Sequence, residues 1–182
     1  MSSRRVVVTG LGLITPVGND VDSAWSALKN GQSGINAIEH FDTSEFSTQF
    51  GGSIKNFDCT DYMLAKEARR MDVFMHYGVA AGVQAFQDSG LEDSSLNLER
   101  AGVAIGSGIG GISSIEENAL LIRDSGPRKV SPFFVPGSII NMIGGSLSIR
   151  FGLQGPNIAV TTACTTGTHN IGLAANMISA NQ

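Results

Sequence analysis

The stretch Asn157–Gly167, with the sequence NIAVTTACTTG, decides the fold, because it runs from an extended β-branched segment directly into a helix. A strand over Asn157–Thr162 and a helix that begins just after Cys164 leave almost no loop between them. Two further apolar runs, Arg5–Thr9 and Ala101–Ile105, also end at a glycine and precede helical stretches. Strands that alternate with helices predict an α/β fold with a mixed or parallel sheet.

Helix signals fill the chain between these strands. Asn19 or Asp20 can cap a helix that ends at Gly31. The stretch Tyr62–Ser89 is helical in two pieces, and its second piece is apolar nearly all round, which predicts a buried helix. The other expected elements are a short strand near Ser53–Phe57, a helix over Ile112–Arg123, a helix from Pro136 to Phe151, and a final helix beyond Thr165.

The composition excludes several classes of protein. The 182 residues carry a formal charge of −4, and 15% of them are charged while 42% are apolar. Disorder requires low hydrophobicity, and nucleic-acid binding favours a basic excess, so we expect a folded domain with no nucleic-acid partner. No run approaches the roughly 20 apolar residues of a membrane span. Polar residues and glycines interrupt the apolar N-terminal run, unlike a signal peptide, so we expect a cytoplasmic protein.

Cys164 lies where the expected strand turns into the last helix. The arrangement is similar to a nucleophile elbow, in which a sharp strand-to-helix turn exposes the reactive side chain. Backbone N–H groups and the helix dipole at such a point favour a thiolate and can also hold a developing oxyanion. The sequence therefore predicts a nucleophilic Cys164, although a free cysteine can also serve as a small buried side chain. Cys59 lies in a polar loop without this context.

The segment Gly106–Gly111, GSGIGG, matches the dinucleotide-binding pattern G-x-G-x-x-G between an expected strand and an expected helix. The second strand and terminal acidic residue of a dinucleotide site do not follow, because a Gly-Pro turn succeeds Asp124. Two other interpretations are a turn where backbone segments pass closely, and a turn that shapes a ligand pocket with Ile109 at its tip.

None of the three histidines is placed to act as a base for Cys164. His169 follows it by five residues and points to another side of the helix, so we expect it to pack or to form hydrogen bonds. His76 lies in the apolar helix as a core residue, and His40 lies in a loop. The histidines and cysteines also lack the spacing of a metal site.

Basic residues gather at two places in this acidic chain. Lys66, Arg69 and Arg70 have the i, i+3, i+4 spacing of one helix face. Arg128 and Lys129 form a second pair in a loop. Such charges are commonly solvated surface, but they also suit the docking of an acidic partner.

Five short motifs carry a resemblance that extends along the whole chain. They are Val8–Gly12 (VTGLG), Pro16–Gly18 (PVG), Gly106–Gly111 (GSGIGG), Ser131–Pro136 (SPFFVP) and Thr162–Cys164 (TAC). Together they resemble the β-ketoacyl-acyl-carrier-protein synthases, and in particular the synthase II group of bacterial type II fatty-acid synthesis. The resemblance implies a thiolase-like fold, in which two related α/β halves form α-β-α-β-α layers with a mixed sheet, and it implies a homodimer.

The resemblance also implies a chemistry for the matching residues. Cys164 would accept an acyl group as a thioester from acyl carrier protein, and decarboxylation of malonyl-carrier protein would supply the carbanion that extends it. Ile109 would form the floor of the acyl pocket, and Val135 would lie near the dimer interface beside the partner's pocket. The acidic carrier protein would face Lys66, Arg69, Arg70, Arg128 and Lys129. No metal and no separate cofactor are implied, because both acyl groups arrive on the phosphopantetheine of the carrier protein.

The resemblance identifies residues 1–182 as an N-terminal β-ketoacyl synthase domain, which is the first half of a family chain. The family's two catalytic histidines and a supporting lysine lie in the C-terminal half, so we expect this chain alone to be unable to complete condensation. Two alternatives remain. One is synthase I, which shares the cysteine mechanism, and the other is a non-catalytic module that binds acyl groups or the carrier protein.

Overall fold

The computed structural model describes residues 4–93 and 95–181. The helices are α1 (Val21–Lys29), α2 (Ala65–Ala68), α3 (Val73–Asp88), α4 (Ile112–Ser125), α5 (Phe134–Ser138), α6 (Met142–Phe151) and α7 (Thr166–Ala180). The strands are β1 (Asn36–Ala37), β2 (Phe50–Gly51), β3 (Val103–Ala104) and β4 (Asn157–Ile158). Short 3₁₀ turns connect them: η1 (Cys59–Asp61), η2 (Leu91–Asp93), η3 (Leu98–Arg100), η4 (Pro127–Lys129) and η5 (Ala163–Thr165).

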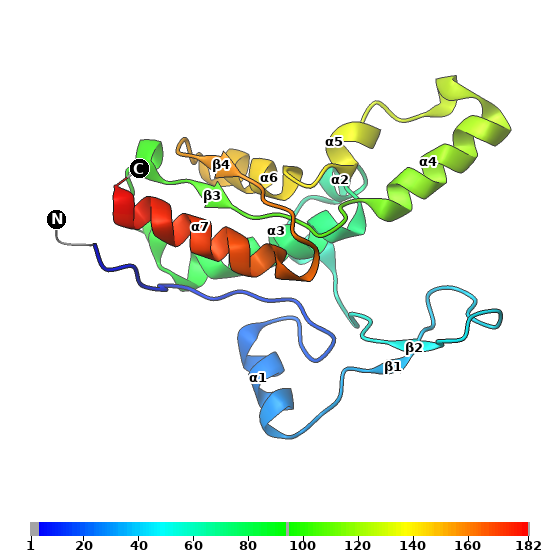
Figure 1. The fold of residues 1–182 in the computed structure, drawn as a ribbon, viewed down its shortest axis with the longest axis horizontal. Coiled ribbons are helices and arrows are strands. Elements are labelled where there is room, and N and C mark those ends of the chain that lie inside the picture. Colours follow the sequence, from blue (N-terminus) through cyan, green and yellow to red (C-terminus); the bar gives the residue numbers. More distant parts are fainter. Residues whose placement is uncertain (1–3, 94, 182) are drawn as a thin grey trace.

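Strands β3 and β4 pair in parallel between two layers of helices (Figure 1). Helix α7 covers one face of the pair, and α6 covers the other with α3 packed against it. In the ladder, Val103 lies opposite Asn157 and Ala104 lies opposite Ile158. A parallel pair requires a long crossover connection, which α4, α5 and α6 supply. The expected α/β class with parallel pairing is therefore confirmed, although each strand is only two residues long.

The core of the molecule lies between α3 and α6. Met75 and Val79 of α3 are buried against Ile143 of α6 within one hydrophobic cluster. Glycines on α3 allow this close approach, because a Cβ on Gly78 would lie 2.6 Å from the Ile143 Cδ1 atom and a Cβ on Gly82 would meet the next α6 side chain at 2.5 Å. The burial expected from the apolar pattern of this helix is confirmed.

Capping side chains and glycines bound the helices at positions that the sequence indicates. The Asp20 side chain, rather than Asn19, caps α1, and its Oδ1 atom accepts a hydrogen bond from the Ser23 amide at 2.8 Å. Gly90 and Gly152 follow α3 and α6 with φ values of 67° each, a left-handed conformation that glycine adopts at little cost.

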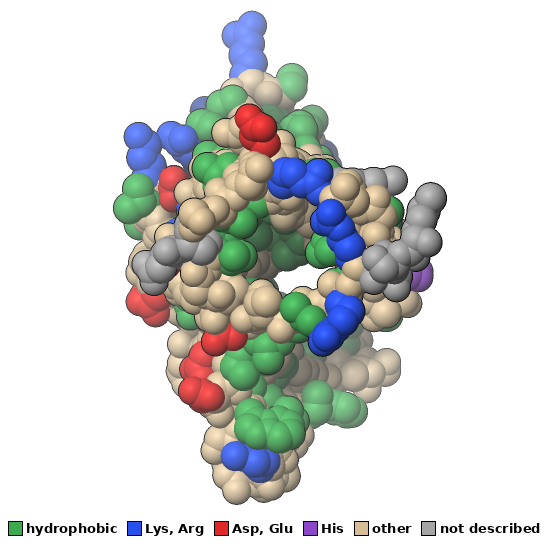
Figure 2. All heavy atoms as spheres, turned by 90° about the vertical axis from the view of Figure 1, so that its left-hand side faces the viewer, with side chains coloured by type: hydrophobic (Ala, Val, Ile, Leu, Met, Phe, Trp, Pro, Cys, Tyr) green, Lys and Arg blue, Asp and Glu red, His purple; other side chains and the backbone are tan. Residues whose placement is uncertain are grey.

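The N-terminal segment differs from its expected structure. Residues Arg5–Thr9 form no strand, and the three valines among them are exposed. The chain runs along α3 instead, where the Leu11 amide donates to Asp88 Oδ2 at 2.8 Å and the Leu13 amide donates to Gln84 Oε1 at 3.1 Å. These side-chain acceptors replace the neighbouring strand that a ladder would need. A cavity of about 380 Å³ lies between this segment, α3 and α6, and Figure 2 shows the molecule hollowed at this end.

The helix expected from Pro136 to Phe151 is divided into α5 and α6. The backbone is extended at Ile139, where ψ is 144°. In a continuous helix the carbonyls of Gly137 and Ser138 would accept bonds from amides one turn later. Here the Asp72 amide donates to the first carbonyl and the Gly111 amide donates to the second, each at 2.9 Å. Tertiary hydrogen bonds therefore compete with the helix and break it.

The short strand expected near Ser53–Phe57 lies earlier in the chain. Strand β2 pairs with β1 in an antiparallel hairpin, with Asn36 opposite Gly51. The expected segment cannot continue this ladder, because Asn56 has φ 53°, outside the extended region.

Two parts of the chain extend away from the layers (Figure 1). One contains α1 and the β1–β2 hairpin, and the other is an arm formed by α4 and η4. No residue of α4 is buried. Within residues 4–93 and 95–181, no helix is both long enough and apolar enough to cross a membrane.

Candidate functional site

Cys164 lies on the turn that joins β4 to α7, as the sequence predicts. The chain continues from β4 to Thr162, forms η5 and enters α7 at Thr166. The side chain of Cys164 is exposed. The preceding residue, Ala163, has φ 51°, in the left-handed region that residues with a Cβ seldom adopt. Such a conformation persists only where the surrounding structure imposes it, so neighbouring contacts must hold this sharp turn in place.

Two buried polar side chains of α7 hold this turn in place. Asn170 is 3% exposed, and its Oδ1 atom accepts from the Val160 amide at 3.1 Å while its Nδ2 atom donates to the Val160 carbonyl at 2.9 Å. This one side chain therefore replaces a strand partner beyond the end of β4. The Thr166 hydroxyl accepts a hydrogen bond from the Thr162 amide at 3.0 Å. Together these bonds fix the position of Cys164 at the start of the helix.

The glycine-rich turn Gly106–Gly111 packs directly against the cysteine turn. A Cβ on Gly106 would lie 2.5 Å from the Val160 carbonyl oxygen, and a Cβ on Gly108 would lie 3.3 Å from the Ala163 carbonyl oxygen. Larger residues would therefore displace the segment that carries Cys164. The interpretation as a close backbone approach is confirmed.

The dinucleotide interpretation of the same turn does not fit the structure. Helix α4 follows the turn, and its N-cap residue, Gly111, has no side chain to cap it. The Ser114 amide in the first turn instead donates to Asp72 Oδ2 at 2.9 Å. A pyrophosphate would need amides at this helix N-terminus, but a carboxylate already occupies the position.

The two residues expected to contact an acyl chain lie on adjoining segments. Ile109, at the tip of the glycine-rich turn, is 69% exposed, and Val135, on α5, is 58% exposed. The Gly111 amide donates to the Ser138 carbonyl at 2.9 Å and so joins this turn to α5. Both side chains present apolar surface, whereas the cavity beside α3 is lined by neither of them and not by Cys164.

The histidines have the roles that their positions suggest. His169 shares a hydrogen bond of 2.7 Å with the Thr162 hydroxyl through its Nδ1 atom. The Nε2 atom of His76 lies 2.9 Å from the Ala68 carbonyl oxygen, which satisfies this partly buried ring. His40 packs edge-on against the next aromatic ring in its loop. Among the residues that the structure describes, no group of three metal-ligating side chains could hold a metal ion.

A protein-family comparison agrees with this geometry. The family model described as beta-ketoacyl synthase, N-terminal domain, matches residues 3–182. The chain belongs to the β-ketoacyl synthase family. It is 63% identical over 178 residues to a 3-oxoacyl-acyl-carrier-protein synthase 2 of Vibrio harveyi, an alignment that covers 98% of this chain and 43% of that protein. The chain therefore spans less than half the length of this curated relative.

Solved ketosynthases have the same fold as this β-ketoacyl synthase chain. The ishigamide ketosynthase/chain length factor superposes with a TM-score of 0.89 at 25% identity, covering 99% of this chain and 45% of that one. A type II polyketide synthase acyl-carrier protein in complex with its ketosynthase has a TM-score of 0.81 at 28% identity, covering 97% and 47% of the two chains. The expected thiolase-like fold is confirmed.

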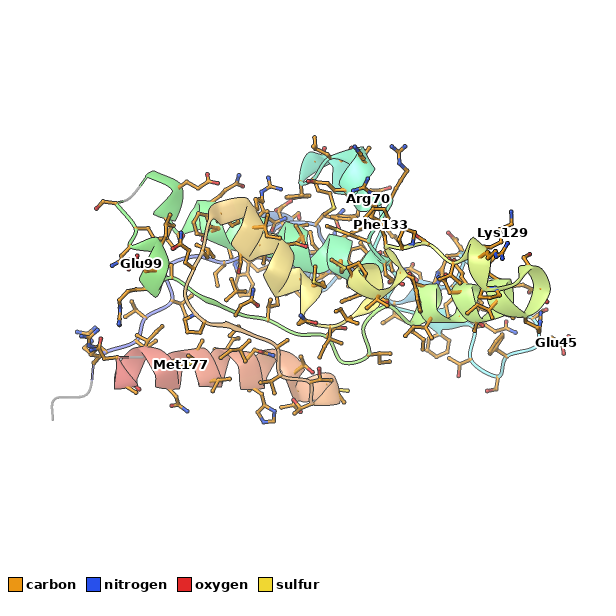
Figure 3. All side chains as sticks on the ribbon, turned by 90° about the horizontal axis from the view of Figure 1, so that it is seen from above. Glu45, Arg70, Glu99, Lys129, Phe133 and Met177 are labelled. Carbon is orange, nitrogen blue, oxygen red and sulfur yellow. The ribbon has the colours of Figure 1, made fainter. Side chains whose placement is uncertain are left out.

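The basic residues of the β-ketoacyl synthase chain form two separate exposed groups. Helix α2 ends at Ala68, so Arg69 is its C-cap residue and Arg70 lies beyond it, contrary to the expected single helix face. The Arg70 guanidinium lies 4.1 Å from the centre of the Phe133 ring in a cation–π contact. Figure 3 shows this pair near the base of the α4 arm and Lys129 toward its far end.

Sequence reasoning missed two residues that shape the candidate site. Asn170 interrupts the apolar pattern of the last helix, and this interruption was the available signal for a buried hydrogen-bonding role. Asp72 is 7% exposed and caps α3, but its second bond, to Ser114, joins residues 42 positions apart. No local pattern indicates a contact of that kind.

Proposed function

We propose that this chain carries the nucleophile of a β-ketoacyl-acyl-carrier-protein synthase II of type II fatty-acid synthesis. The observation that carries the proposal is the exposed thiol of Cys164 on a strained turn at the start of α7, in a chain of this family. Relatives named synthase 2 favour synthase II over synthase I, because two of them are 63% and 64% identical to this chain.

The proposed reaction has two stages. The Cys164 thiolate attacks the carbonyl carbon of an acyl-phosphopantetheine thioester, and the pantetheine thiol leaves with a proton, so that the acyl group becomes bound to the cysteine. Malonyl-carrier protein then loses its carboxyl group as carbon dioxide, and the electron pair of the broken bond forms a new carbon–carbon bond to the acyl carbonyl. The cysteine leaves as thiolate, and the product is 3-oxoacyl-carrier protein, two carbons longer.

The local geometry supports Cys164 in both stages. Its amide donates no hydrogen bond to another described residue. The next amide, of Thr165, donates to the Thr162 carbonyl at 3.1 Å. A free amide beside the reacting carbonyl can stabilise the oxyanion that forms on it. The dipole of the 15-residue helix α7 adds positive potential at the same end.

We assign the acyl chain to a surface that includes Ile109, and we propose that Val135, near the dimer interface, contacts the acyl chain in the partner's pocket. The glycine-rich turn places Ile109 on the segment that packs against Ala163, next to the nucleophile. An acyl chain that covers these exposed side chains would gain roughly 0.8 kcal/mol for each buried methylene group. The proposal needs no metal or cofactor held by this chain, because both substrates arrive as thioesters on the carrier protein.

Acyl transfer to Cys164 is the decisive test. After incubation of the chain with acyl-carrier protein, mass spectrometry of the intact chain and of its peptides is expected to locate one acyl adduct on Cys164. Cys59→Ser is the matched control and should retain the adduct, whereas Cys164→Ser should lose it. Carrier-protein binding without any adduct would contradict the enzyme proposal and support a non-catalytic binding module.

We propose that the carrier protein docks on Lys66, Arg69, Arg70, Arg128 and Lys129. All five are exposed, and charge complementarity to an acidic partner accelerates and orients docking. Replacing both basic residues of η4 by glutamine should weaken carrier-protein binding about fivefold, with a strong dependence on salt. Arg123→Gln on α4 is the control, since Arg123 is already paired with Asp124 at 2.6 Å and should change binding little. Equal effects of the two changes would argue against this docking surface.

We also propose that the protein is a homodimer through the surface around Val135. This residue lies on α5, which packs against α4, and Ile139 just after α5 is 40% exposed. Helix α4 itself exposes apolar side chains. Sedimentation equilibrium should show a dimer that Val135→Asp dissociates, because an ionised carboxylate in an apolar interface is costly. A monomer at every concentration of the unsubstituted chain would contradict this proposal.

A further inference from the structure

Backbone hydrogen bonds anchor the glycine-rich turn Gly106–Gly111 at both ends. Where the chain leaves β3 and enters the turn, the Ile105 amide donates to the Ile158 carbonyl at 3.1 Å. At the other end, the Gly111 amide donates to the Ser138 carbonyl at 2.9 Å. These two bonds determine where the turn begins and ends, but neither reaches its middle.

The middle of the turn has little rigidity of its own. Gly108 and Gly110 stand on either side of Ile109, and Gly110 has φ 83°. Glycine restricts the backbone less than any other residue does. Gly108 approaches Ala163 closely but has no side chain that interlocks with it, and the Ile109 side chain is 69% exposed. The position of Ile109 therefore depends on hydrogen bonds that other residues of the turn make.

Ser107 links the middle of the turn both to itself and to a neighbouring segment. Its hydroxyl oxygen accepts a hydrogen bond from the Gly110 amide at 2.9 Å, which closes the turn. Its carbonyl oxygen accepts a hydrogen bond from the Thr161 hydroxyl at 3.1 Å. Among the described residues, this second bond is the only hydrogen bond between the glycine-rich turn and the segment that leads from β4 to Cys164.

The Thr161 hydroxyl is held at a fixed place beside the turn. The residue before it, Val160, is bonded to the Asn170 side chain, and the residue after it, Thr162, is bonded to the Thr166 hydroxyl. The Thr161 backbone between them is therefore fixed relative to α7. The chain that leaves β4 passes beside the chain that leaves β3 before α7 begins (Figure 1). One exposed side chain thus connects two segments that are 54 positions apart.

We propose that Thr161 is a positioning residue whose hydroxyl holds the turn bearing Ile109 beside Cys164, and so increases the preference of the site for long acyl chains. This inference rests on the proposed assignment of Ile109 to acyl contact. Loss of the hydroxyl frees the Ser107 carbonyl and the middle of the turn, while the backbone bonds at both ends persist. Ile109 then covers less of a long chain, and the stabilisation falls with the apolar area removed from water.

The test uses alkyl maleimides, which react with Cys164 without a carrier protein. In a Cys59→Ser background, the alkylation rate with N-octylmaleimide is divided by the rate with N-ethylmaleimide, and this ratio is compared with that of free N-acetylcysteine. Thr161→Val keeps the shape of the side chain without the hydroxyl and should lower the ratio about threefold, rather less than the contact of one methylene group is worth. Thr161→Ser keeps the hydroxyl and should restore the ratio.

A second variant loosens the same turn from within. Ser107→Ala removes the acceptor of the Gly110 amide and should also lower the ratio, so the proposal stays testable if Thr161→Val does not fold. In all three variants the rate with N-ethylmaleimide should hardly change, because the bonds that hold the Cys164 turn to α7 are intact.

Thr168→Val is the matched control. Thr168 is exposed on α7, and its hydroxyl forms no hydrogen bond to another described residue, so this change should leave the ratio as it is. Hydrogen exchange of peptides that contain Gly110 should accelerate in Thr161→Val and not in the control. Ile109→Ala should lower the ratio by itself, and adding Thr161→Val should have no further effect, since both changes act through one side chain.

The outcomes separate the positioning role from the proposed function. Equal ratios for Thr161→Val and Thr168→Val would overturn the positioning role, as would additive effects of Thr161→Val and Ile109→Ala; neither result would affect the acyl assignment of Ile109. An unsubstituted ratio no higher than that of N-acetylcysteine would overturn both the assignment and the inference. A failure of acyl transfer from the carrier protein, with the Thr161 effect intact, would reject the proposed reaction and support the positioning role.

Discussion

Replacing Asn170 by alanine tests whether one buried amide holds the turn that carries Cys164. The side chain forms three hydrogen bonds: from the Val160 amide at 3.1 Å, to the Val160 carbonyl at 2.9 Å and to the Thr166 carbonyl at 2.8 Å. Alanine would leave the amide and the carbonyl of Val160 without partners in a partly buried position. At roughly 1.5 kcal/mol for each unsatisfied group, the expected loss is about 3 kcal/mol in the free energy of unfolding.

The assay is unfolding of the two chains by urea and by heat, followed by circular dichroism. For a chain of this length, about 3 kcal/mol corresponds to a fall of roughly 9 °C in Tm. Asn176→Ala is the control, because it removes the same side chain from an exposed position of the same helix and should change stability by less than about 0.5 kcal/mol. If the two variants unfold at the same urea concentration, the bonds from Asn170 do not stabilise the turn and the reasoning is refuted.

Three further predictions concern other parts of the chain. Gly106→Ala should destabilise the chain by about 2 kcal/mol, because the new Cβ would lie 2.5 Å from a carbonyl oxygen. Gly172→Ala has open space around it and should instead stabilise α7 by about 0.5 kcal/mol. Equal urea midpoints for the two variants would contradict this difference. The Ser23 backbone amide bound to Asp20 lowers the pKa of that carboxyl below its usual value, so its stabilising effect is present at neutral pH and is lost as pH falls through the folded-state pKa. The difference in Tm between the unsubstituted chain and Asp20→Ala should therefore shrink in acid, and a difference that grows there would be inconsistent with the cap. His169→Ala should change the rate of Cys164 alkylation by less than about twofold, because the ring bonds to a threonine hydroxyl rather than to the thiol; a fall of tenfold or more would show that it activates the thiol.

Local sequence patterns predicted the helices better than the strands. The cap at Asp20, the apolar pattern of α3 and the glycine that ends α6 all act within one or two turns of the chain, so they can be read from adjacent residues. The run Arg5–Thr9 had the composition of a strand, but a strand also needs a neighbour in register, and the structure aligns the residues that follow it with α3 side chains instead. Composition indicates the capacity to form a strand and not the presence of its partner.

The position of Cys164 on a strand-to-helix turn could be predicted, but not what holds it there. The transition from β-branched residues into a helix at Cys164 is a local feature, and the structure has the cysteine on that turn. The left-handed Ala163 gave no sequence signal, because alanine usually occupies other conformations. Ile109 lies at the tip of the glycine-rich turn, whereas the link from this turn to α5 depends on the bond between Gly111 and Ser138, which are 27 positions apart.

The sequence by itself determined the class of fold, the family motifs, the cysteine at the strand-to-helix turn and the glycines that allow close approach. These features depend on residue size, on backbone freedom and on periodicity, all of which are properties of neighbouring residues. Only the tertiary structure decided where α5 ends, because its last carbonyls accept bonds from Asp72 and Gly111 rather than from its own next turn. It also decided that one buried carboxylate caps two helices and that Asn170 completes the strand end at Val160. A buried polar group must find a partner, and that partner is determined by which segments fold against each other and not by distance along the chain.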